Sequence, residues 1–110
     1  MEYFNYTFND DEWTIYLIED GDDVIADEDA VAQTKFDEKE IYFRRSHYTM
    51  IHVIHELCHV YFGYCYLENT TEITIADFEE IACTLFSHNA DKIRTSSQII
   101  YQKLNDLKDK

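Results

Sequence analysis

The sequence contains no proline and only two glycines, Gly21 and Gly63, among its 110 residues. Flexible linkers are usually built from such residues, so their scarcity argues against separate domains joined by linkers. No apolar run is long enough to cross a bilayer, and the N-terminus lacks the basic start and apolar stretch of a signal peptide. We therefore expect residues 1–110 to form one domain without a membrane segment.

Cysteine is also scarce: the chain has three, so at least one of them cannot form a disulfide within the chain. An odd number of thiols without a regular spacing is typical of reduced cysteines in a cytoplasm. We therefore expect a cytoplasmic protein.

Basic residues are few, because nine Lys and Arg stand against 23 Asp and Glu, for a net charge of −14. Residues 1–40 contain 14 acidic and 2 basic side chains, whereas residues 41–110 contain 9 acidic and 7 basic ones. The first part would repel phosphates, so we expect no direct binding to nucleic acid. It would attract a basic regulatory protein, or it could simply be a solvated surface.

Segments rich in aromatic and β-branched residues come first and predict strands at 3–8, 12–19, 31–36 and 40–44. Apolar residues then recur at helical spacing and predict helices at 47–63, 75–91 and 96–107. Gly63 marks the expected end of the first helix, and Thr74 with Asp77 resembles a capping box before the second. Strands followed by helices are typical of an α+β domain.

The first predicted helix contains the segment His55-Glu56-Leu57-Cys58-His59. Side chains four residues apart lie one above the other on a helix, so His55 and His59 can hold one Zn²⁺ together. Glu56 stands at the rim of the same face, where its carboxylate can activate a zinc-bound water for attack on a peptide carbonyl. The alternative is two histidines on a polar helix face without a metal.

The surroundings of this segment favour a built site over a chance match. We expect four apolar residues around it to form the buried face of the helix: Ile51, Ile54, Cys58 and Phe62. His52 lies one turn before His55 and could contact the substrate or a zinc ligand, or could be a partly exposed surface residue.

A catalytic zinc usually has three protein ligands and one open position, so a third ligand must come from elsewhere. Glu79 lies at the border of the apolar stripe around Ala82 and Leu85, where a buried carboxylate would need a partner such as zinc. Glu80 points away from this stripe and is the second choice. Both could instead be surface glutamates in the first turn of a helix. Two histidines and one glutamate suit zinc better than magnesium or calcium.

Three pieces of the stretch from Thr34 to Ile93, namely TKFDEKEIYF, IHELCHVYF and DFEEIACTLF, resemble the short gluzincin-like zinc metallopeptidases related to the ImmA/IrrE proteins. This group includes phage-encoded members, which often act on repressor or regulatory proteins. The resemblance implies a small twisted, mainly antiparallel sheet packed on the active-site helix, with one strand bordering the cleft. It also implies zinc ligands at His55, His59 and Glu79 and a catalytic role for Glu56.

The chain departs from the family pattern at Ile81, where an acidic residue would be expected before Ala82, and we expect no separate DNA-binding or sensor segment. The choice between Glu79 and Glu80 therefore stays open.

These features favour a zinc-dependent endopeptidase of narrow specificity toward a regulatory protein. A peptide substrate could add as a β-strand to the strand formed by Glu40, Ile41, Tyr42, Phe43 and Arg44. The alternative is a non-catalytic acidic binding or inhibitor protein, in which residues 1–40 mimic DNA or cover a basic partner and the zinc site is structural or vestigial. In a third interpretation, residues 96–110 cover the cleft and inhibit the enzyme.

Overall fold

The computed structural model describes residues 1–66 and 75–110. Four strands come first: β1 (Glu2–Phe8), β2 (Asp11–Ile18), β3 (Ala32–Lys35) and β4 (Glu40–Arg44). Two helices follow: α1 (Met50–Tyr66) and α2 (Ile75–Lys108). This order confirms the α+β class. Thr74, and with it the expected capping box, lies outside the described residues.

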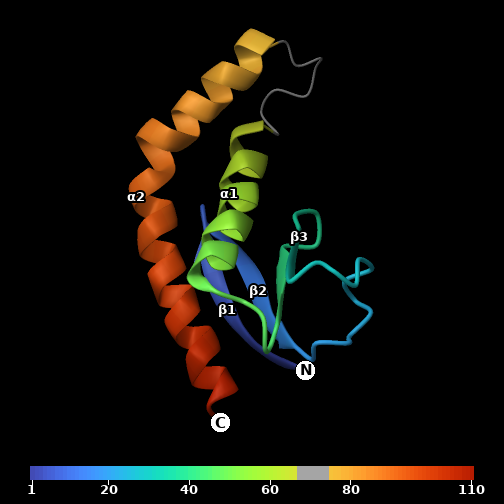
Figure 1. Cartoon of the computed structure of the whole chain (residues 1–110). Coiled ribbons are helices and arrows are strands. Elements are labelled where there is room, and N and C mark those ends of the chain that lie inside the picture. Colours follow the sequence, from blue (N-terminus) through green and yellow to red (C-terminus); the bar gives the residue numbers. More distant parts are fainter. Residues whose placement is uncertain (67–74) are drawn as a thin grey trace.

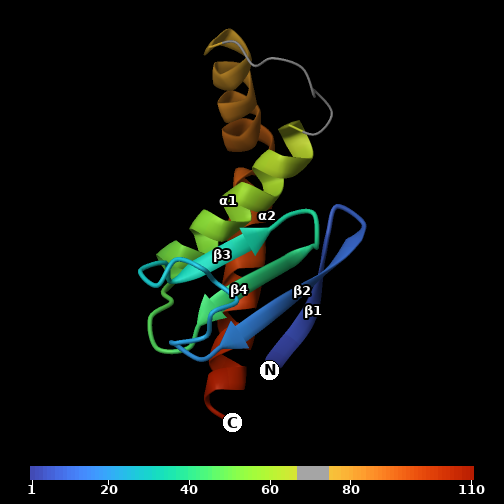
Figure 2. The same cartoon turned by 90° about the vertical axis from the view of Figure 1, so that its right-hand side faces the viewer.

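The strands form one mixed, mostly antiparallel sheet in the order β1-β2-β4-β3. β1 and β2 form the expected hairpin, in which the turn residues Asn9 and Asp10 have φ angles of 50° and 68°. Asn and Asp adopt this left-handed conformation more readily than most residues, which suits a tight hairpin turn. β2 and β4 run parallel, and β3 stands at the end of the sheet. Both helices lie behind one face of the sheet in Figure 2.

Helix α1 begins and ends three residues later in the sequence than predicted. At its start, the backbone N–H of Thr49 donates to Nδ1 of His52 at 3.0 Å, which satisfies one of the free amide groups of the first turn. Gly63 lies inside the helix instead of ending it. A Cβ atom at Gly63 would overlap the ring of Phe36, so glycine here permits close packing against the turn between β3 and β4.

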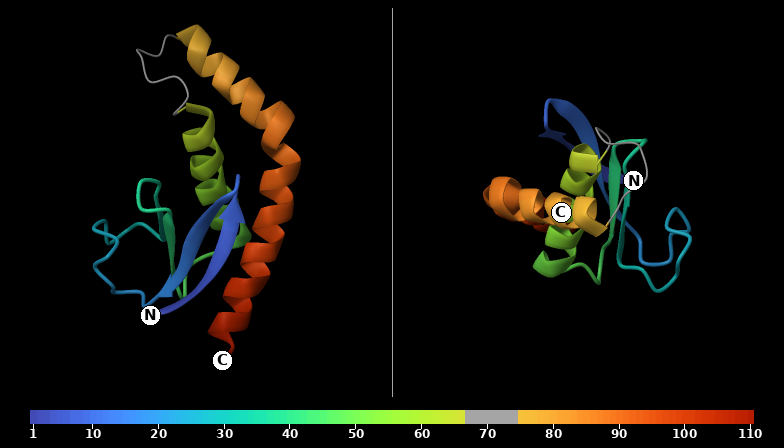
Figure 3. Two further views of the ribbon diagram at one scale, coloured as in Figure 1. Left: turned by 180° about the vertical axis from the view of Figure 1, so that it is seen from behind. Right: turned by 90° about the horizontal axis from the view of Figure 1, so that it is seen from above.

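The second and third predicted helices are one continuous helix, α2, of 34 residues. No glycine or proline interrupts residues 91–96, and the buried stripe continues through Ile93, Ser97, Ile100 and Leu104. The helix is bent and passes α1 first and the β1–β2 hairpin afterwards (Figures 1 and 3). Neither described helix contains an apolar stretch that could span a bilayer.

The core lies between the sheet and the two helices. Its fully buried side chains come from the sheet, from α1 and from α2: Trp13, Ile15, Phe43, Leu57, Ile100 and Leu104. The C-terminal segment 96–108 is therefore part of the core. It does not form the cover over the cleft that the self-inhibition interpretation requires.

The acidic connection between β2 and β3 is organised by Arg44, which is 3% exposed. Its guanidinium donates hydrogen bonds to five backbone carbonyls, those of Asp20, Asp22, Ile25, Asp27 and Ala30. Because these carbonyls share one donor group, the connection wraps around a fixed charge and leaves most of its carboxylates outside.

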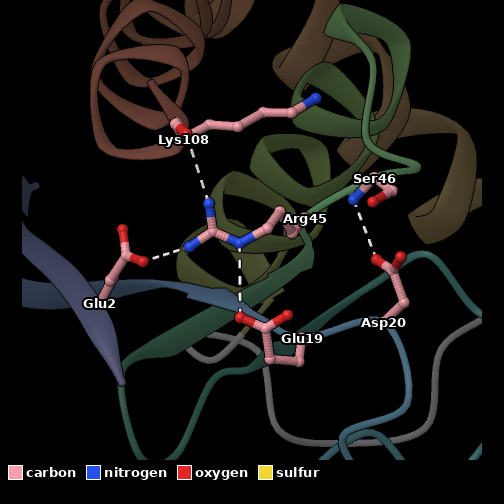
Figure 4. A network of polar contacts seen from close by, with 6 residues as sticks. All are labelled: Glu2, Glu19, Asp20, Arg45, Ser46 and Lys108. Atoms are coloured by element: carbon pink, nitrogen blue, oxygen red, sulfur yellow. Dashed lines mark hydrogen bonds and ion pairs between the residues drawn. The ribbon is translucent and has the colours of Figure 1, made fainter. Parts of the chain in front are cut away.

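The next residue, Arg45, joins distant parts of the chain at the surface (Figure 4). It makes ion pairs with Glu2 at the start of β1 and with Glu19, and it donates to the carbonyl of Lys108 at the end of α2. Beside it, the N–H of Ser46 donates to Asp20 at 2.9 Å and lowers the pKa of that carboxyl.

Candidate metal centre

His55, Glu56 and His59 form the candidate metal centre on α1, as the sequence predicts. One ligand atom from each lies within 4.8 Å of the other two. The Nε2 atoms of His55 and His59 are 3.2 Å apart, and both histidines are exposed. Glu56 is only 6% exposed. The HExxH spacing therefore places two imidazoles and one carboxylate around a common point.

The distance between the two imidazole nitrogens fits a tetrahedral metal. Two nitrogens that each lie about 2.0–2.1 Å from a tetrahedral zinc are about 3.3 Å from one another. The same 3.2 Å contact is also compatible with a hydrogen bond in which one ring nitrogen carries the proton. The spacing of the two nitrogens is therefore compatible with a bound metal ion.

Glu56 is held by a residue that the sequence reading missed. The hydroxyl of Thr34, on β3, donates to Oε1 of Glu56 at 2.9 Å. It also contacts the backbone carbonyl of Glu56 at 3.3 Å. This bond satisfies one oxygen of a largely buried carboxylate and ties the end strand of the sheet to the candidate centre.

A hollow of about 310 Å³, which we call the β3 cleft, opens between α1 and β3. It is lined by Ala32, Gln33, Thr34 and Phe36 and by the three residues of the candidate centre. Oε1 of Gln33 is buried and has no hydrogen-bond partner among the described residues.

The prediction that a substrate peptide pairs with the strand at residues 40–44 is wrong. The residues Glu40, Ile41, Tyr42, Phe43 and Arg44 form β4, which lies between β2 and β3 and is hydrogen-bonded on both sides. A strand with two neighbours has no free amide or carbonyl groups to offer a third. The strand at the end of the sheet is β3, which also borders the cleft, so the expectation that one strand borders the cleft applies to β3.

The predicted buried face of α1 is also wrong. Ile51 is 76% exposed, Ile54 is 38% exposed, and Cys58 is exposed as well. The face that packs on the sheet consists of Val53, Leu57, Val60 and Tyr61. The histidines could have indicated this, because side chains that hold a metal within reach of a substrate lie on an open face of the helix, and the stripe opposite His55 and His59 is then the buried one.

Glu79 and Glu80 lie on α2, and both are exposed. Neither joins the group formed by His55, Glu56 and His59 among the described residues. The burial argument that favoured Glu79 fails, because the side of α2 that is buried at this level carries Ile81, while Ala82 is exposed. The third ligand therefore stays a prediction, without a structural reason to prefer one glutamate.

His52 has a local role in this structure. Its Nδ1 atom lies 3.0 Å from both the N–H and the hydroxyl of Thr49, at the start of α1. Its contacts thus cap the helix that carries the candidate centre, and it is not a member of the ligand group.

Comparison of the chain with family models, curated proteins and solved structures gives no match. The candidate centre, with its geometry on α1, is therefore the basis for a functional proposal.

Proposed function

We propose that this chain is a zinc-dependent endopeptidase of narrow specificity toward a regulatory protein, similar to the gluzincin-like enzymes related to ImmA/IrrE. One observation carries the proposal. The two exposed imidazoles, 3.2 Å apart, stand beside a buried Glu56 that Thr34 holds in place, and all of them line a cleft at the end strand of the sheet.

His55 and His59 would hold the zinc ion, with Glu79 or Glu80 as candidates for a third ligand. Zinc, when bound, lowers the pKa of its water to about 7 and polarises a carbonyl oxygen. Glu56 takes up the proton of the attacking water on its carboxylate and passes it to the leaving amine. The hydrogen bond from Thr34 to Oε1 restricts the rotation of this carboxylate and leaves its other oxygen for that proton.

The substrate would bind as an extended peptide that adds to β3. Gln33 and Thr34 are on this strand and line the cleft, so the added peptide would pass the candidate centre. The 14 acidic side chains of residues 1–40 would attract a basic target, which supports a regulatory protein as substrate.

The test combines zinc binding with cleavage of a peptide library followed by mass spectrometry. Glu56→Gln is expected to bind zinc at the wild-type stoichiometry and to lose about 10²- to 10⁴-fold in cleavage rate, because it keeps the shape but cannot accept the proton. His59→Asn is expected to lose zinc. Glu12→Gln, a change of an exposed glutamate on β2, is the matched control and should retain both properties. Wild-type cleavage by Glu56→Gln would contradict the proposal.

One observation favours a second candidate, an acidic binding protein. Arg44 fixes the connection after β2 through five backbone carbonyls, so the exposed carboxylates there form an ordered surface. Asp23, Glu28 and Asp29 are exposed in this connection, and none of their carboxylates forms a hydrogen bond in the described structure. Such a surface would suit a basic partner.

The two candidates are separated by neutralising these three carboxylates as Asn or Gln. If the protein acts by binding, the neutralised variant loses its affinity for a lysine-rich model peptide, and Glu56→Gln keeps it. If the protein acts as a peptidase, Glu56→Gln is the variant that loses function toward every peptide that the wild type cleaves.

A further inference from the structure

A second concave surface lies on the other side of α1 from the β3 cleft. This α1/α2 groove has a volume of about 480 Å³, and its apolar lining includes Ile54 and Cys58 from α1 and Ala82, Phe86 and Ala90 from α2. Phe86 is 83% exposed at its edge. A large aromatic side chain beside an open apolar groove is unusual on a surface that meets only water.

The groove is self-complementary along α2. Glu79, Ala82, Phe86, Ala90 and Arg94 recur at spacings of three or four residues and therefore lie on one face of the helix. Glu79 comes seven residues before Phe86, and Arg94 comes eight residues after it. When a second copy of this face is turned by 180° about Phe86, each Glu79 meets an Arg94, and each Ala82 meets an Ala90.

The small side chains make a close approach possible. Ala82 and Ala90 are exposed on either side of Phe86, so the two helices can approach closely enough for the two Phe86 rings to pack side by side at the crossing. Arg94 lines the end of the groove, and its ion pair with Asp91, at 3.4 Å, joins two exposed side chains that can separate easily.

The charge distribution permits this association in spite of the net charge of −14. The groove belongs to residues 41–110, which contain 9 acidic and 7 basic side chains. The acidic connection after β2 lies on the opposite side of the molecule from α2 (Figure 1). Two copies joined through α2 would keep their acidic surfaces apart, whereas an anionic membrane surface would repel the chain as a whole.

We propose that the α1/α2 groove is the interface of a two-fold homodimer, with antiparallel α2 segments that cross at Phe86. The two Phe86 rings pack against one another at the crossing and cover the apolar linings of both grooves, and the pair formed by Glu79 and Arg94 closes both ends. The dimer does not rest on the proposed peptidase activity. It does assign Glu79 to the interface, so that only Glu80 of the two candidates remains for the metal.

Sedimentation equilibrium of the full chain tests the dimer. A chelator and a reducing agent are present, so that neither metal bridges through exposed histidines nor disulfides contribute. The wild type is expected to dimerise, and Phe86→Lys to weaken the dimer by at least about 30-fold, as a central aromatic side chain would. Ile99→Lys, at an exposed position of α2 outside the groove, is the matched control and should leave dimerisation unchanged.

An exchange of the two charges tests whether a second copy of this chain covers the α1/α2 groove. Glu79→Arg and Arg94→Glu should each weaken the dimer by about 10-fold, because a two-fold interface contains the pair twice. The double variant should restore dimerisation. The two residues are 15 positions apart, about 22 Å along one helix, so the restoration cannot arise within one chain.

Three results of the association measurements would overturn the dimer. These are a wild type that stays monomeric at all concentrations, a dimer that Phe86→Lys leaves intact, and a double charge variant without restoration. Loss of zinc in Glu79→Arg would also overturn it, because Glu79 would then be a metal ligand. Loss of cleavage in Glu56→Gln has no bearing on the dimer, so the two proposals can fail separately.

Discussion

The two sides of helix α1 are both apolar, but only one of them is covered. Val53, Leu57, Val60 and Tyr61 face the sheet and are buried. Ile51, Ile54 and Cys58 face away from it and are exposed. Between these stripes lie the two histidines and Glu56. The comparison shows that apolar spacing identifies a helix without identifying its buried side, because a sheet can cover only one of two stripes.

The largest change in stability is expected when one residue of the buried stripe is truncated and compared with one of the exposed stripe. Leu57 has no exposed surface, so Leu57→Ala is expected to lower the free energy of unfolding by about 2–5 kcal/mol. Ile54→Ala should lower it by less than about 1 kcal/mol, because its side chain already contacts water. Urea unfolding, at a concentration where the chain is monomeric, measures both. Equal losses would mean that the two sides of α1 are covered alike.

A smaller effect is expected where α1 meets β3. Thr34→Val keeps the shape of the side chain but removes the hydroxyl that donates to Glu56. A largely buried carboxylate then lacks its donor, which should lower the free energy of unfolding by about 1–3 kcal/mol at neutral pH. Thr34→Ser, which keeps the hydroxyl, is the control and should remain closer to the wild type. A valine variant as stable as the serine variant would show that this contact does not hold Glu56.

On the covered side of α1, Tyr64 leads us to expect a loss of stability at alkaline pH. Burial, together with the hydrogen bond that Tyr64 donates to Asp11 at 2.7 Å, raises the pKa of Tyr64 to about 12. A pKa above the ordinary value of 10.0 means that the folded chain favours the neutral phenol. This contribution to stability is complete below pH 10 and is lost as the pH rises toward 12.

Unfolding by urea between about pH 9 and 12 measures this loss. The stability of Tyr64→Phe should fall less steeply over that window. Tyr42 and Tyr48, whose pKa values burial also raises to about 12, should maintain part of the slope. Identical slopes for the variant and the wild type would exclude a contribution from Tyr64.

The smallest effect is expected on the open side. Ile51 is 76% exposed and does not line the α1/α2 groove, so Ile51→Ser should change the free energy of unfolding by no more than about 0.5 kcal/mol. A loss as large as that of Leu57→Ala would mean that Ile51 is covered in solution, and it would break the comparison between the two sides.

Much of the fold follows from local patterns in the sequence. The hairpin of β1 and β2 is predictable because the aromatic and β-branched segments are separated by Asn9 and Asp10, which tolerate the turn conformation. The change from strands to helices is equally local. The division of α2 into two helices was wrong because its polar middle resembles a boundary, although the buried stripe continues through Ile93 and Ser97.

The residues of the candidate centre also fall into two groups, those that the local sequence predicts and those that it does not. The juxtaposition of His55, Glu56 and His59 depends only on helical geometry and was predicted. Thr34 and Gln33 were missed, because a threonine and a glutamine on a short strand carry no local signal of a site. The preference for Glu79 over Glu80 had no support, since it rested on a choice of buried side that sequence spacing cannot make.

The sequence alone thus determined that a helix would present two histidines and a glutamate together, because residues one turn apart share a face in every α-helix. Only the tertiary structure decided what surrounds them. The order β1-β2-β4-β3 places β3 at the end of the sheet and beside Glu56, and it encloses β4. Strand order and the covered side of α1 depend on contacts between residues far apart in the chain, which no local periodicity encodes.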